Sequence, residues 1–337
     1  MGAFRKWFVA LGLALFILPC SALAQSSYAV YEKGLERAST ARKVSPLSLD
    51  TVFGDQISLF NGSVSFTHVD VSIPGNSDIP VELRRTLTVD DRLRGSTRHL
   101  GGFLDWDLDI PYLQAVVTTA YGWRPTTNAA SVNQRCSLPG APPMFGGVDA
   151  DDYWDGYTMH IPGQGNLSLL MSPSASIPSP TDGNTYPWTS KEHWRLRCKS
   201  GTKNSYGGES FIAVSPSGLT YHFDWGVSRP YTALTNPYSN MPIQRQVVFF
   251  LATRIEDRFG NWVELAYSGD KLTGITSNDG RYVTPNWAGA QIASVASSAG
   301  TWNYAYAGSG LSTVTQPDAS TWQFTPTGSM QINPPVW

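Results

Sequence analysis

The chain has 337 residues, a formal net charge of −2 and only 15% charged residues. This balance provides no basic surface for nucleic acid, so we expect no nucleic-acid partner. The content of 12 Trp, 15 Tyr, 31 Gly and 23 Pro residues favours short strands separated by turns. We therefore expect an all-β protein of one or two domains.

Residues 1–24 have the features of a signal peptide. An apolar run over residues 7–18 follows two basic residues, and Ala22 and Ala24 give the small–x–small form of a cleavage site. The run is shorter than the ~20 apolar residues that a membrane-spanning helix needs. A lipid attached at Cys20 is the alternative, but Pro19 does not fit the small residue expected before such a cysteine. We expect an exported protein that is periplasmic, secreted or at the surface of a bacterium, with no membrane span after cleavage.

The next part of the chain separates into an arm and a β-rich domain. Residues 25–48 are polar and predict a linker or N-terminal arm. Residues 49–245 alternate short apolar segments with turns such as Asn61-Gly62, which is typical of a hairpin. This pattern predicts a sandwich-like N-terminal β domain with long loops.

The cysteine content predicts one disulfide. Cys20 leaves with the signal peptide, so Cys136 and Cys198 remain as an even pair in an exported chain. A loop of about 60 residues closed in this way stabilises a fold by roughly 4 kcal/mol on the chain-entropy model. Two cysteines without CxxC spacing are too few for a zinc site, so the disulfide is the favoured interpretation.

A short phrase occurs three times within residues 246–326. It opens with an aromatic residue, has a glycine two places later, and carries aliphatic residues at its sixth and ninth places. The copies start about 20 residues apart, which leaves room for two strands of ordinary length and two turns. We expect each copy to form a β-hairpin, and the hairpins to lie side by side as a ribbon of sheet. The signature residues are Tyr267, Gly269, Leu272 and Ile275, then Trp287, Gly289, Ile292 and Val295, then Tyr306, Gly308, Leu311 and Val314.

The phrase resembles the YD or RHS repeat of large secreted and surface proteins. These include bacterial RHS and wall-associated proteins, insecticidal toxin subunits and animal teneurins. The preceding region is also similar to the N-terminal segment of bacterial RHS proteins, in the stretches FGDQISLFNGSVSF, SIPGNSDIPVELRR, DWDLDIP and AVSPSGLTYHFDW. The resemblance spans about residues 50–326. It implies repeats that wind into a hollow β-shell, which in many bacterial members encloses a C-terminal toxic domain.

Two departures from the family pattern modify this expectation. The chain has only three copies of the phrase, too few to close a shell, and the Asp-Pro-x-Gly-Leu core motif of the family is absent. After residue 326 the phrase decays, and residues 327–337 form a tail. We therefore expect a truncated or split member with an incomplete shell, whose partner is a C-terminal toxin, an effector or a further repeat-bearing chain.

Three aspartates alternate along one expected strand. Asp105, Asp107 and Asp109 begin like a calcium loop, but such a loop also needs Gly at its sixth place and a carboxylate at its twelfth. Ile110 and Val116 occupy those places, so the match fails. A solvent-facing strand edge kept acidic against edge-to-edge pairing is the favoured interpretation.

Other candidate groups give no catalytic pattern. A glycosidase needs paired carboxylates, and an acidic loop beside aromatic rings offers them, but a plain turn is favoured, with a weak calcium or sugar contact as an alternative. We expect no catalytic residue, no cofactor and no metal, because the histidines are scattered singly and no nucleophile motif is present. The loop carboxylates are Asp149, Asp151, Asp152 and Asp155, and the histidines are His68, His99, His160, His193 and His222.

Trp302, Tyr304 and Trp322 are candidate glycan contacts, because alternation places the rings of a strand on one face. Rings that fill the inner face of the ribbon are the favoured interpretation, since they recur with the period of the repeat. The first functional hypothesis is an exported, non-catalytic structural module that carries or encapsulates a toxin or surface effector domain missing from this chain. The alternatives are a cell-surface carbohydrate-binding module and, less favoured, a secreted glycan hydrolase.

Overall fold

The computed structural model describes residues 55–57, 64–89, 100–123, 134–172, 181–235 and 242–324. The chain divides into two units, Met1–Ala38 and Ser39–Trp337, and all described residues belong to the second. Strands make up 59% of the described residues and helix 1%, so the prediction of an all-β protein is confirmed. No helix within the described ranges is long and apolar enough to cross a membrane.

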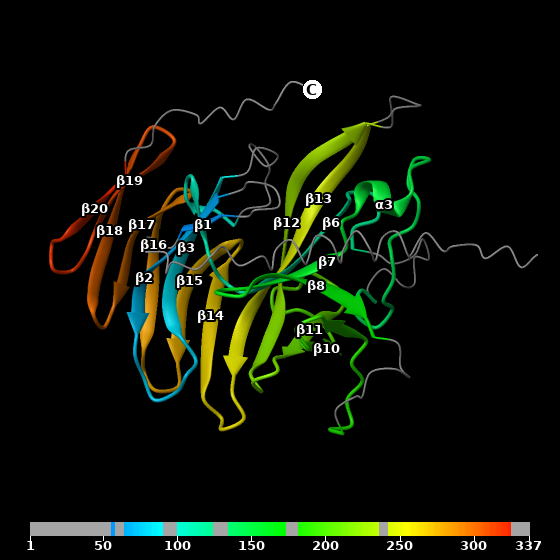
Figure 1. Ribbon diagram of the computed structural model, residues 1–337, viewed down its shortest axis with the longest axis horizontal. Helices are drawn as coiled ribbons and strands as arrows, with labels where there is room; N and C mark the ends of the chain where they lie inside the picture. Colours follow the sequence, from blue (N-terminus) through cyan, green and yellow to red (C-terminus); the bar gives the residue numbers. More distant parts are fainter. Residues whose placement is uncertain are drawn as a thin grey trace, which may run out of the picture. The chain divides into compact units, whose positions relative to one another are not determined.

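The described residues form β-strands and one short helix, α3 (Ala150–Tyr153) (Figure 1). The signal peptide, the arm, the tail, His99 and the Asn61-Gly62 turn lie outside the described residues. In chain order the strands are β1 (Asp55–Ile57), β2 (Val64–Ile73), β3 (Val81–Val89), β4 (Gly102–Phe103), β5 (Trp106–Leu108), β6 (Tyr112–Thr118), β7 (Tyr157–Ile161), β8 (Gly165–Met171), β9 (Trp188–Ser190), β10 (Arg195–Lys199), β11 (Ser210–Val214), β12 (Thr220–Thr235), β13 (Pro242–Glu256), β14 (Trp262–Ser268), β15 (Lys271–Ser277), β16 (Tyr282–Ala288), β17 (Gln291–Ser297), β18 (Gly300–Ala307), β19 (Gly310–Thr315) and β20 (Thr321–Gln323).

Eight strands, β6 to β13, close into an antiparallel barrel. Each of these strands pairs antiparallel with the next one in the chain. The barrel closes where residues 245–251 of β13 pair with residues 112–118 of β6. Closure matters because it satisfies backbone groups that an open sheet would leave unpaired at its edges.

Aromatic side chains fill the barrel. Trp123 stacks on Tyr157 with ring centroids 4.8 Å apart, and its indole also contacts Phe211 and Phe250. Trp188 packs edge-on against Tyr157 at 5.0 Å. Along β7, buried and less buried residues alternate, as expected of a strand with one face in a core. The barrel interior is therefore a packed core, as in other barrels of this size.

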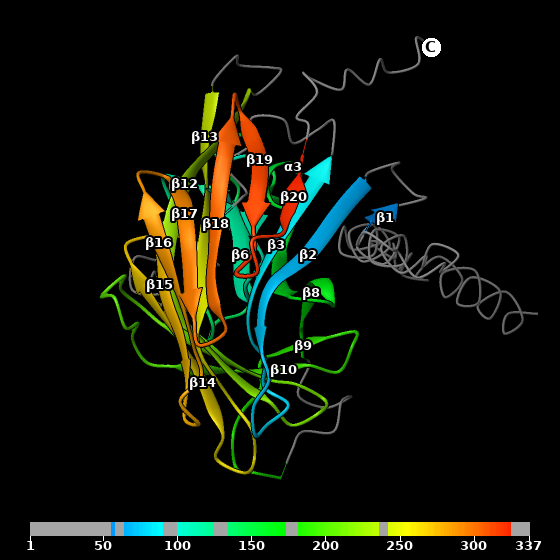
Figure 2. The same ribbon diagram turned by 90° about the vertical axis from the view of Figure 1, so that its left-hand side faces the viewer.

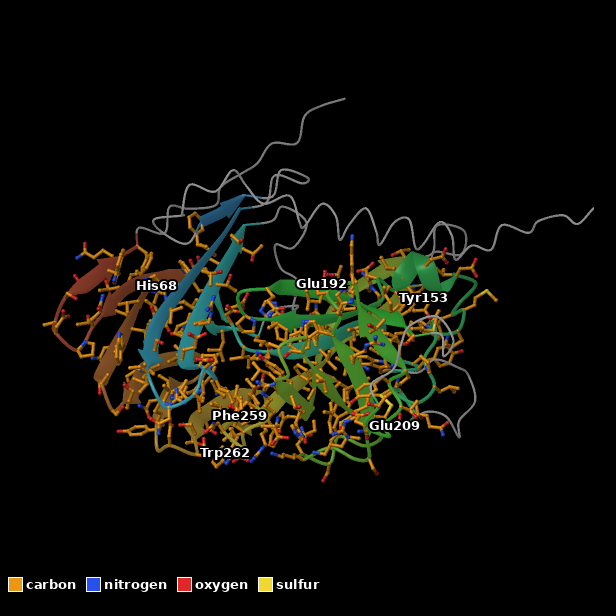
Figure 3. The ribbon with its side chains drawn as sticks, turned by 60° about the horizontal axis from the view of Figure 1, so that its bottom comes forward. His68, Tyr153, Glu192, Glu209, Phe259 and Trp262 are labelled. Carbon is orange, nitrogen blue, oxygen red and sulfur yellow. A yellow bond between two sulfur atoms is a disulfide. The ribbon has the colours of Figure 1, made fainter. Side chains whose placement is uncertain are left out.

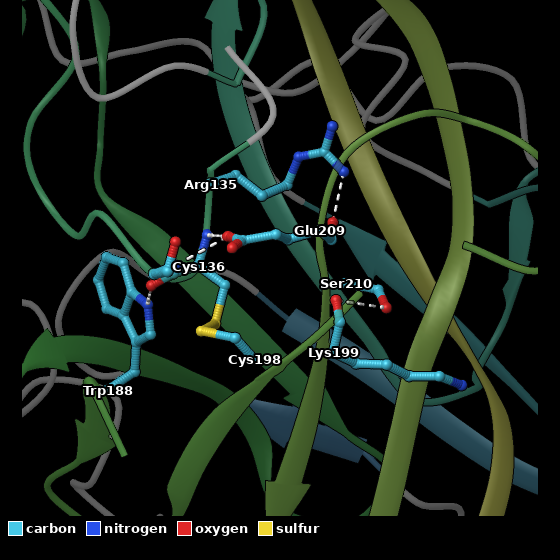
Figure 4. Close-up of a disulfide and its surroundings, with 8 residues drawn as sticks. Arg135, Cys136, Trp188, Cys198, Lys199, Glu209 and Ser210 are labelled. Carbon is cyan, nitrogen blue, oxygen red and sulfur yellow. Dashed lines mark hydrogen bonds between the residues drawn. A yellow bond between two sulfur atoms is a disulfide. The ribbon is translucent and has the colours of Figure 1, made fainter. Parts of the chain in front are cut away.

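A disulfide joins Cys136 to Cys198 of β10, with Cα atoms 5.5 Å apart, which confirms the predicted pair (Figure 4). Backbone N–H groups of Cys136 and Ser137 donate to the carboxylate of Glu209, at 2.9 and 2.8 Å. The guanidinium of Arg135 donates to the carbonyl of Glu209 at 2.6 Å. The segment before α3 is thus fixed to the barrel wall by covalent and polar contacts.

The C-terminal strands continue from the barrel as a meander. Beyond its contact with β6, β13 pairs through Arg254–Glu256 with β14. From β14 to β20 each strand pairs antiparallel with the next, so hairpins lie side by side (Figure 2). We call β14–β20 the ribbon. Because β13 belongs to both parts, residue 245, the expected domain boundary, falls inside a strand.

The N-terminal strands form a second layer beside the ribbon (Figure 2). β1 pairs with β2, β2 with β3, β3 with β5, and β5 with β4. β3 contacts β15 and β16, and a single bridge joins Gly102 of β4 to Gln291 of β17. The apolar face of the ribbon is consequently covered by strands from much earlier in the chain.

Candidate functional site

The three copies of the repeated phrase form hairpins with the same local geometry. The hairpins are β14–β15, β16–β17 and β18–β19, and each has a register shift immediately before its signature aromatic residue. Gly269, Gly289 and Gly308 have φ values of 61°, 63° and 59°. These angles lie in the left-handed region that favours glycine, which explains the fixed place of glycine in the phrase.

The aliphatic positions of the phrase face the core. The two aliphatic places of a copy are three residues apart, so strict alternation would put them on opposite sides of the strand. The register shift in each hairpin lies between them and returns both to the same side. Burying a side chain of this size contributes about 1.5–3 kcal/mol relative to leaving it exposed. All six are buried, namely Leu272, Ile275, Ile292, Val295, Leu311 and Val314.

The signature aromatic residues join each hairpin to the strand before it. The hydroxyl of Tyr267 donates to the carbonyl of Ala252 at 2.7 Å. In the second copy the indole N–H of Trp287 donates to the carbonyl of Leu272 at 2.7 Å. In the third copy the hydroxyl of Tyr306 donates to the carbonyl of Ile292 at 2.6 Å. We call these the rung contacts.

The rung contacts explain which aromatic residues the phrase accepts. Tyrosine and tryptophan both carry a donor at the far end of an apolar ring, so Trp287 replaces tyrosine without losing the bond. Burial, followed by the charge of Asp224, raises the pKa of Tyr267 well above its ordinary value. Burial likewise raises the pKa of Tyr306. Both hydroxyls therefore keep the proton that they donate.

A buried cluster fixes the ribbon to the N-terminal layer. Asp70 of β2 accepts from Nε of Arg85 on β3 at 2.9 Å and from the hydroxyl of Tyr304 on β18 at 3.0 Å. The Arg85 guanidinium lies over the rings of Trp106 at 4.2 Å and Phe324 at 4.9 Å. We call Asp70, Arg85, Trp106, Tyr304 and Phe324 the anchoring cluster. Removing one partner of such a buried ion pair costs about 3–5 kcal/mol.

The charges of the anchoring cluster are balanced. Asp70 and Arg85 each have side chains only 1% exposed. Burial opposes ionisation of Asp70, but a hydrogen bond from His68 and the charge of Arg85 outweigh it, so the pKa of Asp70 lies below its ordinary value. His68, on β2 (Figure 3), approaches Asp70 through Nδ1 at 2.9 Å. The cluster therefore retains its ion pair at neutral pH.

A second set of contacts joins the ribbon to the N-terminal layer at the β15–β16 turn. Nη1 of Arg281 donates to the carbonyls of Ile73 and Ile79, at 3.1 and 3.2 Å, at the two ends of the β2–β3 loop. Nε of the same side chain donates to Asp279 at 2.8 Å. Gly75 lies so close to this guanidinium that a Cβ atom there would overlap it. Sequence patterns did not predict this role for Arg281, because the residue follows a turn and resembles a surface charge.

The candidate glycan contacts differ in their exposure. Trp302 and Tyr304 are buried, at 9% and 7% exposure, and cannot offer a ring face to a sugar in this arrangement. Trp322 on β20 is 39% exposed and lies edge-on to His68 with ring centroids 5.4 Å apart. Of the three residues, Trp322 alone has a ring that an external ligand can reach.

The three alternating aspartates serve different contacts. A carboxylate oxygen of Asp105 accepts from the backbone N–H of Leu311 at 2.7 Å, and Asp107 accepts from Gly101 at 2.9 Å. Asp109 is buried and is not part of a solvent-facing row, because Arg84 donates to it. No group of three metal-ligating side chains occurs in the part of the chain that the structure describes.

The acidic loop and the histidines show no shared site. Asp149 precedes α3 as its N-cap residue without a side-chain capping bond. His160 contacts Asp109 at 2.6 Å, and His222 contacts Glu256 at 3.2 Å. These separate carboxylate contacts agree with structural roles.

Comparison with known proteins does not assign the chain to a family. No family model matches it, and no curated protein matches its sequence significantly.

Proposed function

We propose that the chain is an exported, non-catalytic structural module of the RHS or YD-repeat type. In this proposal it forms the first part of a β-shell that carries or encapsulates a toxin or surface effector. The rung contacts support the proposal most, because they give each copy of the phrase one purpose, which is to join a hairpin to its predecessor. A unit that must stack on its neighbour to bury its apolar face builds an elongated scaffold.

The edge of the ribbon is where the proposed shell would continue. Among the described strands β20 pairs only with β19. The backbone N–H of Phe324 donates to Ser312 of β19, so by alternation the N–H of Gln323 faces away from β19. An unpaired edge of this kind accepts a further strand from another chain.

The test co-expresses the chain with the product of the reading frame that follows its own gene. We expect that product to carry further repeats and to form a stoichiometric complex on size-exclusion chromatography. Gln323→Pro removes the outward donor and should abolish the complex, whereas Gln323→Ala keeps the donor and should not. A following frame without repeats, or a complex equally stable to both substitutions, would contradict the proposal.

A carbohydrate-binding module is a second candidate, supported by the exposed ring of Trp322. Stacking of an aromatic ring against a sugar ring needs an accessible aromatic face, and Trp322 provides one beside His68. Saturable binding on a glycan array that Trp322→Ala abolishes and Trp302→Phe preserves would favour this candidate. Unchanged binding by Trp322→Ala would exclude the ring from the site.

A further inference from the structure

A recess lies where the barrel meets the ribbon and the N-terminal layer. The volume available to the centre of a water-sized sphere is ≈ 80 Å³, and the recess opens to solvent. Its walls are mainly aliphatic and come from strands far apart in the sequence. They include Ile110, Ile161, Ile255, Val263 and Ile275. A recess of this composition accommodates an apolar group.

Two opposite charges line the same recess next to each other. Nη1 of Arg84 lies 3.3 Å from Oε1 of Glu82, and both side chains are about one-fifth exposed, at 20% and 18%. Within the described residues, no hydrogen bond engages Oε2 of Glu82 or Nη2 of Arg84. One acceptor and one donor are therefore available to a ligand.

The third charged side chain of the recess, Asp109, is already satisfied. Asp109 accepts from Nε of Arg84 at 3.1 Å and contacts Nε2 of His160 at 2.6 Å, so both of its oxygens are used. Burial opposes the ionisation of Asp109, but His160 and Arg84 outweigh it and hold its pKa below the ordinary value. Burial raises the pKa of Tyr221 to about 12, so its phenol adds no charge at neutral pH. The charged groups with free hydrogen-bonding capacity are thus Glu82 and Arg84.

We propose that this recess binds an aliphatic α-amino acid, with the ammonium on Glu82, the carboxylate on Arg84 and the side chain against the aliphatic wall. An α-amino acid carries its two opposite charges on neighbouring groups of one carbon, which matches the adjacent Glu82 and Arg84. Nη2 of Arg84 can donate a charge-assisted hydrogen bond to one oxygen of that carboxylate. The site is independent of the proposed scaffold function.

The test is isothermal titration calorimetry of the full chain with three probes of equal side chain. L-Leucine carries both charges, 4-methylpentanoate only the carboxylate and isoamylamine only the ammonium. Because a charged hydrogen bond accounts for about a tenfold or greater change in affinity, we expect leucine to bind at least about tenfold more tightly than either analogue. Equal affinity for the three probes, or no saturable binding of leucine, would overturn the proposal.

Two matched variants locate the site. Glu82→Gln keeps the shape of the side chain and an oxygen for Arg84, and should weaken leucine binding about tenfold without weakening 4-methylpentanoate binding. Asp270→Asn removes a carboxylate that also pairs with an arginine, Arg229, but lies outside the recess, and should have no effect. Thermal unfolding verifies that each variant is folded. Leucine affinity unchanged in Glu82→Gln, or lowered equally in both variants, would overturn the assignment.

Discussion

The rung contacts make a quantitative prediction for Tyr267→Phe. The substitution keeps the ring, which is buried, and removes only the hydroxyl that donates to Ala252. The carbonyl of Ala252 then loses a partner inside the core. An unsatisfied buried acceptor costs about 1–3 kcal/mol, so the free energy of unfolding should fall by that amount. Tyr282→Phe is the matched control, because Tyr282 is 41% exposed and should change stability by less than about 0.5 kcal/mol.

Urea denaturation measures both variants, with an unchanged slope expected because the exposed surface is the same. The pH dependence gives an independent check. Since the pKa of Tyr267 is raised in the folded state, its contribution is present below the unfolded pKa of about 10 and is lost as the pH rises above it. The difference between wild type and Tyr267→Phe should therefore narrow in alkali. Equal stability losses in Tyr267→Phe and Tyr282→Phe would refute the reasoning.

Three further predictions concern other parts of the fold. Gly226→Ala should lower the free energy of unfolding, measured in urea, by about 1–3 kcal/mol, because the new Cβ would overlap the ring of Tyr206. Gly274→Ala is the control and should be much milder, because a Cβ there has no neighbour closer than 3.9 Å. Arg281→Met should cost about 2–5 kcal/mol, because two buried loop carbonyls lose their donor; limited proteolysis should then cut the β2–β3 loop first, and an uncut loop would contradict the role. The ion pair of Asp70 contributes stability above the ordinary pKa of about 4, and this contribution is lost as the pH falls below it. Asp70→Asn should therefore be less stable than the wild type at neutral pH, and its free energy of unfolding should fall less on acidification than that of the wild type.

The sequence is informative where a structural rule acts over a short distance. The glycine at the third place of the phrase, such as Gly269, indicates a left-handed turn residue, and the aliphatic spacing of Leu272 and Ile275 indicates the buried face. The disulfide was predictable because the expected signal peptide contains Cys20, which leaves Cys136 and Cys198 as a pair. Each of these inferences uses a few residues and no long-range pairing.

Closure of the barrel and the anchoring cluster could not be predicted in this way. The pairing of β6 with β13 joins segments separated by more than a hundred residues, and no local pattern specifies the register. Arg85 has a signal that was available in principle, since it takes an inward place after Val81 and Leu83 in an alternating strand. The sequence does not reveal its partner Tyr304, which belongs to the ribbon. Tertiary contacts of this kind depend on the complete fold.

The position of β13 sets an order of assembly. As the chain is synthesised from its N-terminus, β6 has no partner for the closing seam until β13 follows, at about 5–20 residues per second. The same strand then supplies the template on which β14 pairs. A fragment ending before β13 would lack both the seam and the first rung, and should remain open and prone to misassembly. Formation of β13 therefore allows the barrel to close and the ribbon to begin pairing.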